Sequence, residues 1–546
     1  MTDSWRVILA LVLSLLVLVL WNVLFPPAQQ APVDQGQEQA DIERQQEEAQ
    51  EEKQDTGQSQ EKEDLEPAGA EELQELEYQP EASDRVSVET PLYKAVFSAR
   101  GGVLQSFLLK QYKQSIKSDS KPIELVTSGA QAHAPLGLLL DGEKTWEQGD
   151  WSLQGEDMQL EKGEEGRLVL QGNLDGLQLQ RELTFQADSY AIQEKTVLLN
   201  KSEDRLQGEL GLNIASKKLV ENESRFNRTD VIYLDQEGLQ KEDDTDTLQQ
   251  DLNVASVKWA GIGSNYFMLA AVPVDTTMPM QTGYQKDIYL VTLEDTVEVS
   301  SGVGQEMDFA YYLGPKEDDY LQGTPNDLGE ALNYGWLNII ASPLVKVLNF
   351  FYGYVGNYGL AIIMLTIVIK ILFWPLSHKS YKSMEKMKKL QPMMKELKEK
   401  YKDDRQKMNQ EVMRLYKTYK VNPAGGCLPM LLQIPVFIAL YEALLGAVEL
   451  RHASFIPQVP FTDIVWLADL SSKDPLYVTP VLMGASMFLQ QKLSPTSGDP
   501  TQAKIMMIMP IVLTFIFLNF PAGLVVYFIT NNLLSMLQQW WVLRKA

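Results

Sequence analysis

The sequence has few of the residues that metal and redox sites need. It contains one cysteine, Cys427, and three histidines, His133, His378 and His452, in 546 residues. A single cysteine excludes a disulfide within the chain, and none of these residues lies in a C-x-x-C or H-E-x-x-H pattern. We therefore expect no metal site and no cofactor.

Motifs for nucleotide binding and nucleophilic catalysis are also lacking. The segment from Gly137 to Gly142 looks briefly like a phosphate-binding loop, but Glu143 stands where such a loop needs lysine. No nucleophile is accompanied by a base elsewhere. The formal net charge of -25 would disfavour nucleic-acid binding if it were spread evenly, but it is not. These absences predict a protein that is not an enzyme and has no DNA partner.

Charge is divided unevenly along the chain. Between Ala28 and Asp84, acidic residues outnumber Lys and Arg about six to one, and glutamine is frequent. Such a segment buries too little apolar surface to offset the entropy of ordering, which predicts a disordered linker over residues 28–84. Basic residues gather between His378 and Gly426, where fourteen Lys and Arg stand against six acids.

Long apolar runs occur at the start of the chain and in its last third. Val7–Phe25 is long enough to cross a hydrocarbon core of about 30 Å. It is either a cleaved signal peptide or a retained anchor, and the absence of an A-x-A cleavage site favours an anchor over residues 1–27. Five later runs predict further spans: Tyr354–Leu376, Leu428–Val448, Val478–Gln490, Ile505–Phe520 and Gly523–Trp541.

The basic residues orient these spans. Short cytoplasmic loops are enriched in Lys and Arg, so residues 378–426 are expected in the cytoplasm. The loop from Glu449 to Pro475 carries only Arg451 and Lys473 and is expected outside. The basic tail, residues 542–546, then ends inside. Six spans place both termini in the cytoplasm of a bacterial-type cell and the acidic region outside its inner membrane.

Residues 85–330 have the pattern of an extracytoplasmic β domain. Short alternating runs such as Arg85–Glu89 are separated by Gly, Asn and Asp turns, which is typical of a β-sandwich. Residues 331–353 then carry apolar side chains at helical spacing, which Pro343 is expected to break. This stretch predicts an amphipathic helix in the outer membrane interface, or else a helix packed on the β domain.

Two apolar stripes predict a helical hairpin in the basic loop. Apolar residues are spaced three, four, three and four from Met387 to Tyr401, and four, three and four from Met408 to Tyr419. A short polar link joins the stripes, as in an antiparallel hairpin. The Lys-rich outer faces suit docking to anionic lipid headgroups or ribosomal RNA. A solvated hairpin whose charges only fix the topology would give the same pattern.

Lys370 fits its surroundings least, because it lies inside the second span. It is roughly 13 Å from the basic loop at 1.5 Å per residue, and a lysine in hydrocarbon costs about 2.5–3.5 kcal/mol. It either snorkels to the cytoplasmic interface or lines a water-filled cavity. Thr366 shares its helix face. Polar residues recur in the later spans, which favours a hydrated cavity: Gln433, Glu442, Asn519, Asn531 and Asn532.

Several motifs resemble the YidC membrane protein insertases. They are Asn422–Pro429 with the following Gln433, Pro435 and Ala439–Tyr441, then Trp374–Leu376, Gly314–Lys316 and Phe520–Leu524. The resemblance covers nearly the whole chain and is to the Gram-negative form, which has a large periplasmic domain. The last five spans are similar to the core shared with mitochondrial Oxa and chloroplast Albino relatives.

The resemblance implies a fold and a site. The fold is a six-helix membrane bundle whose last five helices, residues 354–541, form the insertase core, with a periplasmic β-supersandwich and a cytoplasmic antiparallel helical hairpin. The family's hydrophilic groove carries an arginine where this chain has Lys370, and its substrate-contacting threonine matches Thr366. The groove glutamine matches Gln433, and a contacting tyrosine is replaced by Phe528. Lys370 therefore keeps the positive charge of the family's arginine, whereas Phe528 lacks the hydroxyl of the family's tyrosine.

The implied function is the insertion and folding of nascent inner-membrane proteins. They would arrive from the ribosome and the signal-recognition pathway, and insertion would proceed alone or with the Sec translocon. Anionic lipids would bind the hairpin. Glu442 stands where the family would have an aromatic residue, so no role follows for it. Two other classes remain, a solute transporter and an envelope-anchored binding or scaffold protein. The lack of inverted repeats disfavours the first, and the polar residues in the spans disfavour the second.

Overall fold

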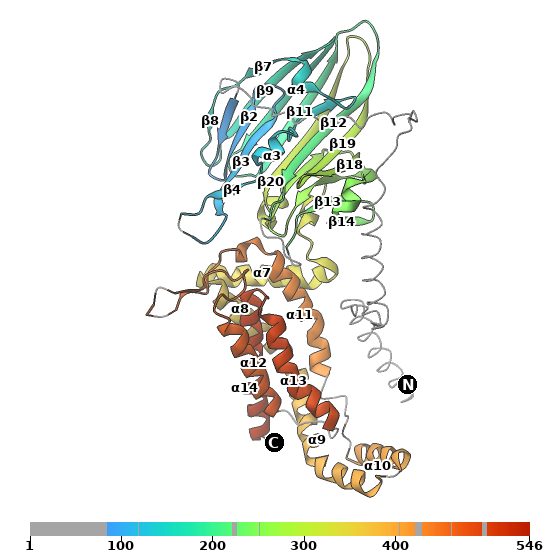
Figure 1. Cartoon of the computed structure of the whole chain (residues 1–546), viewed down its shortest axis with the longest axis vertical. Helices are drawn as coiled ribbons and strands as arrows, with labels where there is room; N and C mark the ends of the chain where they lie inside the picture. The colour runs from blue at the N-terminus through green and yellow to red at the C-terminus, as the bar shows by residue number, and fades with distance from the viewer. Residues whose placement is uncertain are drawn as a thin grey trace, which may run out of the picture. The chain divides into compact units, whose positions relative to one another are not determined.

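The computed structural model describes residues 85–545 apart from 118, 221–226, 251, 403, 420, 422–427, 460, 463 and 494–499. The expected anchor, residues 1–27, the expected linker, residues 28–84, and most of the Asn422–Pro429 motif lie outside the described residues. The described part consists of a β domain followed by a helical region (Figure 1).

The β domain is built from strands that alternate with short turns and small helices. The strands are β1 Arg85–Glu89, β2 Tyr93–Ser98, β3 Leu104–Lys113, β4 Pro122–Glu124, β5 Leu138–Leu140, β6 Glu143–Lys144, β7 Asp150–Gln154, β8 Met158–Gln159, β9 Glu165–Leu174, β10 Leu177–Gln186, β11 Ala191–Asn200, β12 Leu206–Lys217, β13 Asp230–Asp235, β14 Gly238–Glu242, β15 Asn253–Val257, β16 Trp259–Gly263, β17 Phe267–Pro273, β18 Met278–Gln285, β19 Ile288–Val299 and β20 Gly304–Pro315. The helices are α3 Ser128–Gln131, α4 Thr145–Gln148, α5 Thr245–Gln249 and α6 Asp318–Leu321.

These strands form three sheets around one hydrophobic core. The largest has nine strands in the order β14-β13-β16-β17-β20-β11-β10-β9-β7, and the others have six (β15-β18-β19-β12-β5-β6) and five (β4-β3-β2-β1-β8). Strand β10 alternates buried and half-buried residues, as expected when one face meets the core. Strands β16 and β17 are buried at every position, so both of their faces are covered. The prediction of a β-sandwich is confirmed by this layered arrangement.

A fully buried ion pair joins this core to two loops. Arg181 of β10 donates to both carboxylate oxygens of Glu194 on β11, each at 2.7 Å. The same guanidinium donates to the backbone carbonyls of Gly101 and Leu136. The hydroxyl of Tyr311 donates to Glu194 at 2.7 Å. A charge pair with every group engaged in this way is tolerated without water, and it fixes where the two loops lie.

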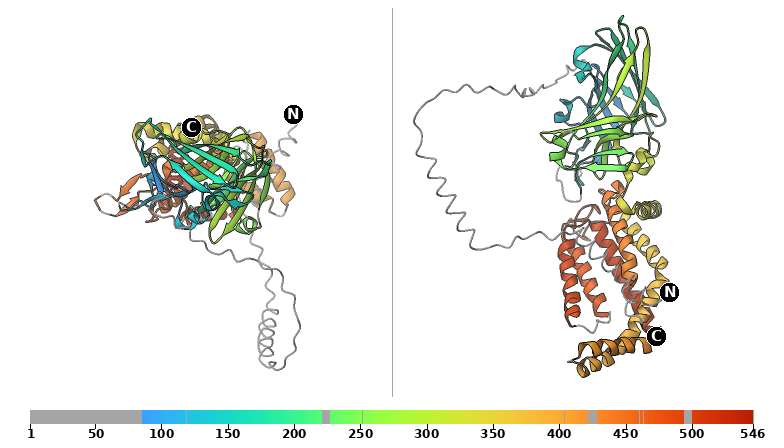
Figure 2. Two further views of the ribbon diagram at one scale, coloured as in Figure 1. Left: turned by 90° about the horizontal axis from the view of Figure 1, so that it is seen from above. Right: turned by 90° about the vertical axis from the view of Figure 1, so that its right-hand side faces the viewer.

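The helical region begins with two 3₁₀ turns and continues as longer helices. These elements are η2 Leu328–Leu332, η3 Gly335–Leu337, α7 Asn338–Val355, α8 Tyr358–Leu372, α9 Trp374–Lys400, α10 Arg405–Thr418, α11 Leu428–Gly446, η5 Val448–Leu450, α12 Val478–Leu493, α13 Pro500–Phe517 and α14 Ala522–Lys545, with a small hairpin of β21 Ile456–Gln458 and β22 Val465–Leu467. Helix α12 packs against both α13 and α14, and α8 packs against α7 and α14. Figure 2 shows the β domain and the helical region from two further sides.

Helix α7 corrects one expectation, because it runs through Pro343 without a break. Pro343 lacks the N–H that would bond to the carbonyl of Ile339, and only that one bond near the start of the helix is lost. The helix ends instead at Gly356, whose φ of 62° is left-handed and whose N–H bonds to the carbonyl of Tyr352 at 2.7 Å. The side chain of Asn357 then caps α8 by accepting from the N–H of Leu360 at 3.0 Å.

The second expected span, Tyr354–Leu376, is not one straight helix. Helices α8 and α9 meet at Phe373 with a bend of 67°. Pro375 lies in the first turn of α9 and has no N–H for the preceding turn, which explains why the bend occurs there. Among the described residues no single helix has both the length and the hydropathy of a membrane span, whereas Tyr358–Leu372 and Trp374–Leu397 reach them together.

In contrast to the β domain, the helical region exposes many large apolar side chains and buries polar ones. Large apolar side chains are exposed along α12, α13 and α14, including Leu482, Leu489, Phe515 and Leu537. Polar side chains of α8, α9, α12 and α14 are buried instead: Thr366, Ser377, Ser380, Ser486, Asn532, Ser535, Gln538 and Gln539. An apolar exterior of this extent is a surface for contact with lipid or with other proteins, not with water.

Candidate functional site

The ammonium group of Lys370 reaches inward to α14. Its Nζ donates a hydrogen bond of 2.7 Å to the hydroxyl of Ser535, which in turn donates to the carbonyl of Asn531 at 2.6 Å. Tyr381 of α9 is a further hydrogen-bonding partner of Ser535. Among the described residues, no carboxylate lies within salt-bridge distance of Lys370, and no neighbouring charge acts on it appreciably. In the part of the chain that the structure describes, the ammonium therefore bonds to a neutral hydroxyl and not to an acid.

Gln433 of α11 reaches the same part of α14. Its Nε2 donates to Oδ1 of Asn531 at 2.7 Å and to the hydroxyl of Tyr527 at 3.3 Å. Tyr527, Asn531 and Ser535 are each four residues apart, so they form one polar strip along α14. The structure therefore brings Lys370 and Gln433 together through this strip, which we call the α14 strip.

Thr366 and Phe528 lie beside this group and do not bond to it. Thr366 is fully buried one turn before Lys370, and its hydroxyl bonds to the carbonyl of Ile362 at 2.6 Å. The ring of Phe528 packs against Phe437 and Phe517, with centroids 4.8 and 4.9 Å apart. Of the four residues singled out from the sequence, two meet at the α14 strip and two pack next to it.

The sequence did not predict that Tyr527 and Ser535 belong to this strip. Serine and tyrosine are common in membrane helices, so neither attracts notice singly. Their spacing was the available signal, because both lie four residues from Asn531, which was noticed. Glu442 is separate from this group, since its carboxylate lies against Gly335 and not near Lys370.

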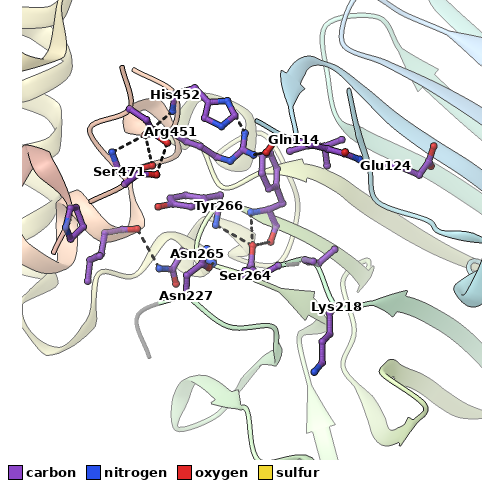
Figure 3. A pocket seen from close by; sticks show the side chains of 18 of the residues that line it. Gln114, Glu124, Lys218, Asn227, Ser264, Asn265, Tyr266, Arg451, His452 and Ser471 are labelled. Atoms are coloured by element: carbon purple, nitrogen blue, oxygen red, sulfur yellow. Dashed lines mark hydrogen bonds between the residues drawn. The ribbon is translucent and has the colours of Figure 1, made fainter. Parts of the chain in front are cut away.

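A larger cavity, of about 1370 Å³, lies between the β domain and the loop that follows α11 (Figure 3). Arg451 donates to the carbonyl of Gln114 at 3.2 Å and lies 5.5 Å from the ring centre of Phe267. Asp469 accepts from the backbone N–H of His452 at 3.1 Å. Burial lowers the pKa of Arg451, while Asp469 opposes that shift. Arg451 and Asp469 are thus engaged by the protein itself, so we interpret this cavity as a junction and not as the candidate site.

These features define a class of protein. The helical region exposes apolar side chains and encloses a cation that no described acid neutralises, which is the arrangement of a membrane protein that handles charged or polar cargo. Two family models match the chain: "60Kd inner membrane protein" over residues 350–546 and "YidC periplasmic domain" over residues 85–347.

Similar proteins cover most of the chain. A membrane protein insertase YidC of Nitratidesulfovibrio vulgaris (strain DP4) is 51% identical over 86% of this chain and 88% of its own length. One from Maridesulfovibrio salexigens is 48% identical over 100% of this chain and 99% of its own. A crystal structure of an active YidC insertase with the first transmembrane domain resolved is 19% identical, with a TM-score of 0.36, and covers 83% of this chain and 92% of that one.

The chain belongs to the YidC family of membrane protein insertases. It is an inner-membrane protein with a periplasmic β-sandwich domain, and its substrates are nascent membrane proteins. The expectation of an insertase is thereby confirmed.

Proposed function

We propose that insertion in this chain begins at Lys370 and the α14 strip, which receive the polar tail of a substrate. The observation that carries this proposal is the bond from Lys370 to Ser535 in the absence of any described carboxylate partner. A charge held only by a hydroxyl is available to an incoming acid. Gln433 supplies a neutral amide for other polar groups of the tail, and Thr366 and Phe528 form the neighbouring wall.

The attraction is strong enough to recruit a tail and weak enough to release it. At an effective dielectric constant of about 20, two unit charges about 4 Å apart attract by about 4 kcal/mol. The bond to Ser535 that an acid displaces contributes about 1 kcal/mol. Water around the site reduces the difference, and even about 1.4 kcal/mol corresponds to tenfold in occupancy.

No nucleotide is required to complete the transfer. A span of about twenty Leu-rich residues gains about 6–12 kcal/mol on entering lipid. With the outside positive, each acidic residue that crosses outward gains about 2.3 kcal/mol per 100 mV. No covalent bond is made or broken in this scheme, so we propose an insertase and chaperone and not an enzyme.

The proposed topology has six spans and both termini in the cytoplasm. It assigns residues 1–27 to an anchor, 28–84 to a periplasmic linker, 85–330 to the β domain, 354–541 to the core with the cytoplasmic hairpin at 378–426, and 542–546 to the tail. Residues 331–353 would form the interfacial helix. Support comes from α7, where Ile339, Phe350 and Tyr354 are exposed on a helix that leads directly into α8.

We further propose that the hairpin of α9 and α10 receives ribosomes, the signal-recognition pathway and anionic lipids. The two helices pack on each other, with the hydroxyl of Tyr416 3.5 Å from the sulfur of Met394. Their outer surfaces carry exposed lysines, including Lys395, Lys402 and Lys407. Cooperation with the Sec translocon rests on the family alone.

Photo-crosslinking of a stalled nascent chain tests this site. A photoreactive residue at Gln433 or Ser535 should crosslink to a substrate that carries an acidic tail. The same residue at Lys346, which is exposed on α7, serves as the control. Equal yields at Ser535 and Lys346 would contradict the proposal.

A further inference from the structure

A second cavity, of about 240 Å³, lies between the end of the β domain and the outer end of α11. Charged side chains from three elements line it: Lys241 of β14, Lys316 just after β20, and Glu442 of α11. The backbone of η3 closes one side at Gly335. This cavity shares no residue with the α14 strip.

Lys316 is buried beside this cavity, and its side chain is only 4% exposed. Gly263 makes room for it, because a Cβ at that position would lie 3.1 Å from Nζ. Burial, together with the charge of Lys241, lowers the pKa of Lys316 to about 7, and Asp230 opposes this shift. A buried ammonium without a partner is costly unless an anion accompanies it.

Glu442 presents the opposite charge to the same cavity. Its Oε2 is buried and has no hydrogen-bond partner. Gly335 has a left-handed φ of 81°, which favours glycine, and a Cβ there would lie 2.8 Å from that oxygen. Glu442 and Lys316 do not form an ion pair within 4.0 Å. A buried cation and a carboxylate oxygen without a hydrogen-bond partner therefore line the same cavity.

We propose that this cavity binds a molecule that carries both a phosphate and an amine, the chemistry shared by an ethanolamine phospholipid headgroup and free phosphoethanolamine. Lys316 and Lys241 would hold the phosphate, and Glu442 would hold the ammonium. At about 30 Å³ per water, the cavity has room for about eight waters, which is close to the size of a phosphoethanolamine group.

The surroundings favour the lipid as the source of this group. Trp336 follows Gly335 directly and is 67% exposed, and Ile339, one turn later, is 85% exposed. Trp336 lies in η3 and Ile339 in α7, and both of these elements pack against α11. Apolar surface at the mouth of a charged pocket suits the acyl chains that a headgroup carries and that free phosphoethanolamine lacks.

Lipid retention by the purified full-length protein tests the proposal. The protein in detergent is mixed with equal amounts of phosphatidylethanolamine and phosphatidylglycerol. Native mass spectrometry then measures how much of each lipid stays bound. We expect wild type to retain phosphatidylethanolamine and Lys316→Gln to retain at least tenfold less. Glu442→Gln should still bind lipid but lose its preference for the ethanolamine headgroup. Lys346→Gln is the matched control, because Lys346 is an exposed lysine on α7 at 3.6 Å from Asp318.

Two further arms keep the result decisive. Free phosphoethanolamine and inorganic phosphate are offered separately, and comparable retention of the first would make the soluble molecule the ligand. Wild type alone should bind phosphatidylethanolamine about tenfold more weakly at pH 8 than at pH 6, because Lys316, with a pKa of about 7, loses its proton while the phosphodiester keeps its charge. Lys241, Asp230 and Glu442 are the other charged groups facing it.

Three outcomes would overturn the proposal. One is equal retention by Lys316→Gln and Lys346→Gln, and another is affinity that does not change between pH 6 and pH 8. The third is a wild-type protein that retains no ethanolamine compound, which would leave water as the bridge between Lys316 and Glu442. None of these readouts depends on insertion activity.

Discussion

Lys370 and Ser535, which are 165 residues apart in the chain, are joined by a hydrogen bond of 2.7 Å between α8 and α14. The bond places an ammonium group beside the polar strip that Gln433 also reaches. Position 535 is therefore the place where the charge of Lys370 can be neutralised without altering Lys370 itself.

A carboxylate at position 535 should neutralise the charge of Lys370. Ser535→Asp places an acid within reach of Lys370, and the resulting pair would compete with the acidic tail of a substrate. We expect insertion of acidic-tailed substrates to fall about tenfold, which corresponds to about 1.4 kcal/mol. Ser535→Asn has similar size and no charge, and it should remain near wild type. If both variants insert acidic-tailed substrates equally well, the charge of Lys370 is not used.

The buried pair in the β domain should respond differently to single and double substitution. Arg181→Met leaves Glu194 buried without its partner, and we expect a loss of about 3–5 kcal/mol. Replacing both residues with methionine should restore most of that loss, because no charge is then buried. Unfolding of the full-length protein in detergent, followed by hydrogen exchange at Gly101 and Leu136, measures the effect. A double variant as unstable as Arg181→Met would contradict this account.

The same pair gives a pH dependence of known sign. Burial alone would raise the pKa of Glu194, but the charge and hydrogen bonds of Arg181 hold it below the usual range. A depressed folded-state pKa means that the stabilisation is present above the unfolded-state pKa of about 4.3 and is lost as pH falls through the folded-state value. The β domain should therefore lose stability on acidification below about pH 4 in wild type, and less so in the double methionine variant.

The basic hairpin should bind its partners through salt-sensitive contacts. Neutralising Lys395, Lys398, Lys402 and Lys407 together should weaken co-sedimentation with ribosomes at low salt, and the difference should shrink as salt is raised. Four exposed lysines of the β domain, Lys117, Lys121, Lys162 and Lys201, provide a charge-matched control. Binding that is unchanged at every ionic strength would leave the lysines a role in topology only.

The topology can be tested by cysteine labelling in intact cells. In a Cys427→Ser background, a cysteine at Ser301, in the exposed turn between β19 and β20, should react with a membrane-impermeant reagent. A cysteine at Lys388, exposed on α9, should react only after the cells are opened. The reverse pattern would refute the orientation from the positive-inside rule.

Some of this architecture follows from the sequence and some does not. Alternating strands predicted the β-sandwich, and the cost of a lysine in hydrocarbon identified Lys370. The bend at Phe373 escaped notice because apolar residues continue on both sides of it, although Pro375 marks it. Local sequence patterns could not predict that Lys316 and Glu442 line the same cavity, because this depends on how the β domain packs against α11.

Insertion by the purified protein in proteoliposomes tests the central claim most directly. One substrate is a short membrane protein with an acidic tail, and the second is the same protein with the acidic residues replaced by their amides. Protease protection of the tail measures insertion. We expect wild type and Lys370→Arg to insert both substrates, because charge alone is needed. Lys370→Glu should insert the acidic-tailed substrate at least tenfold less and nearly spare the neutral one. Equal insertion of both substrates by Lys370→Glu would contradict the account and leave Lys370 as a snorkelling residue.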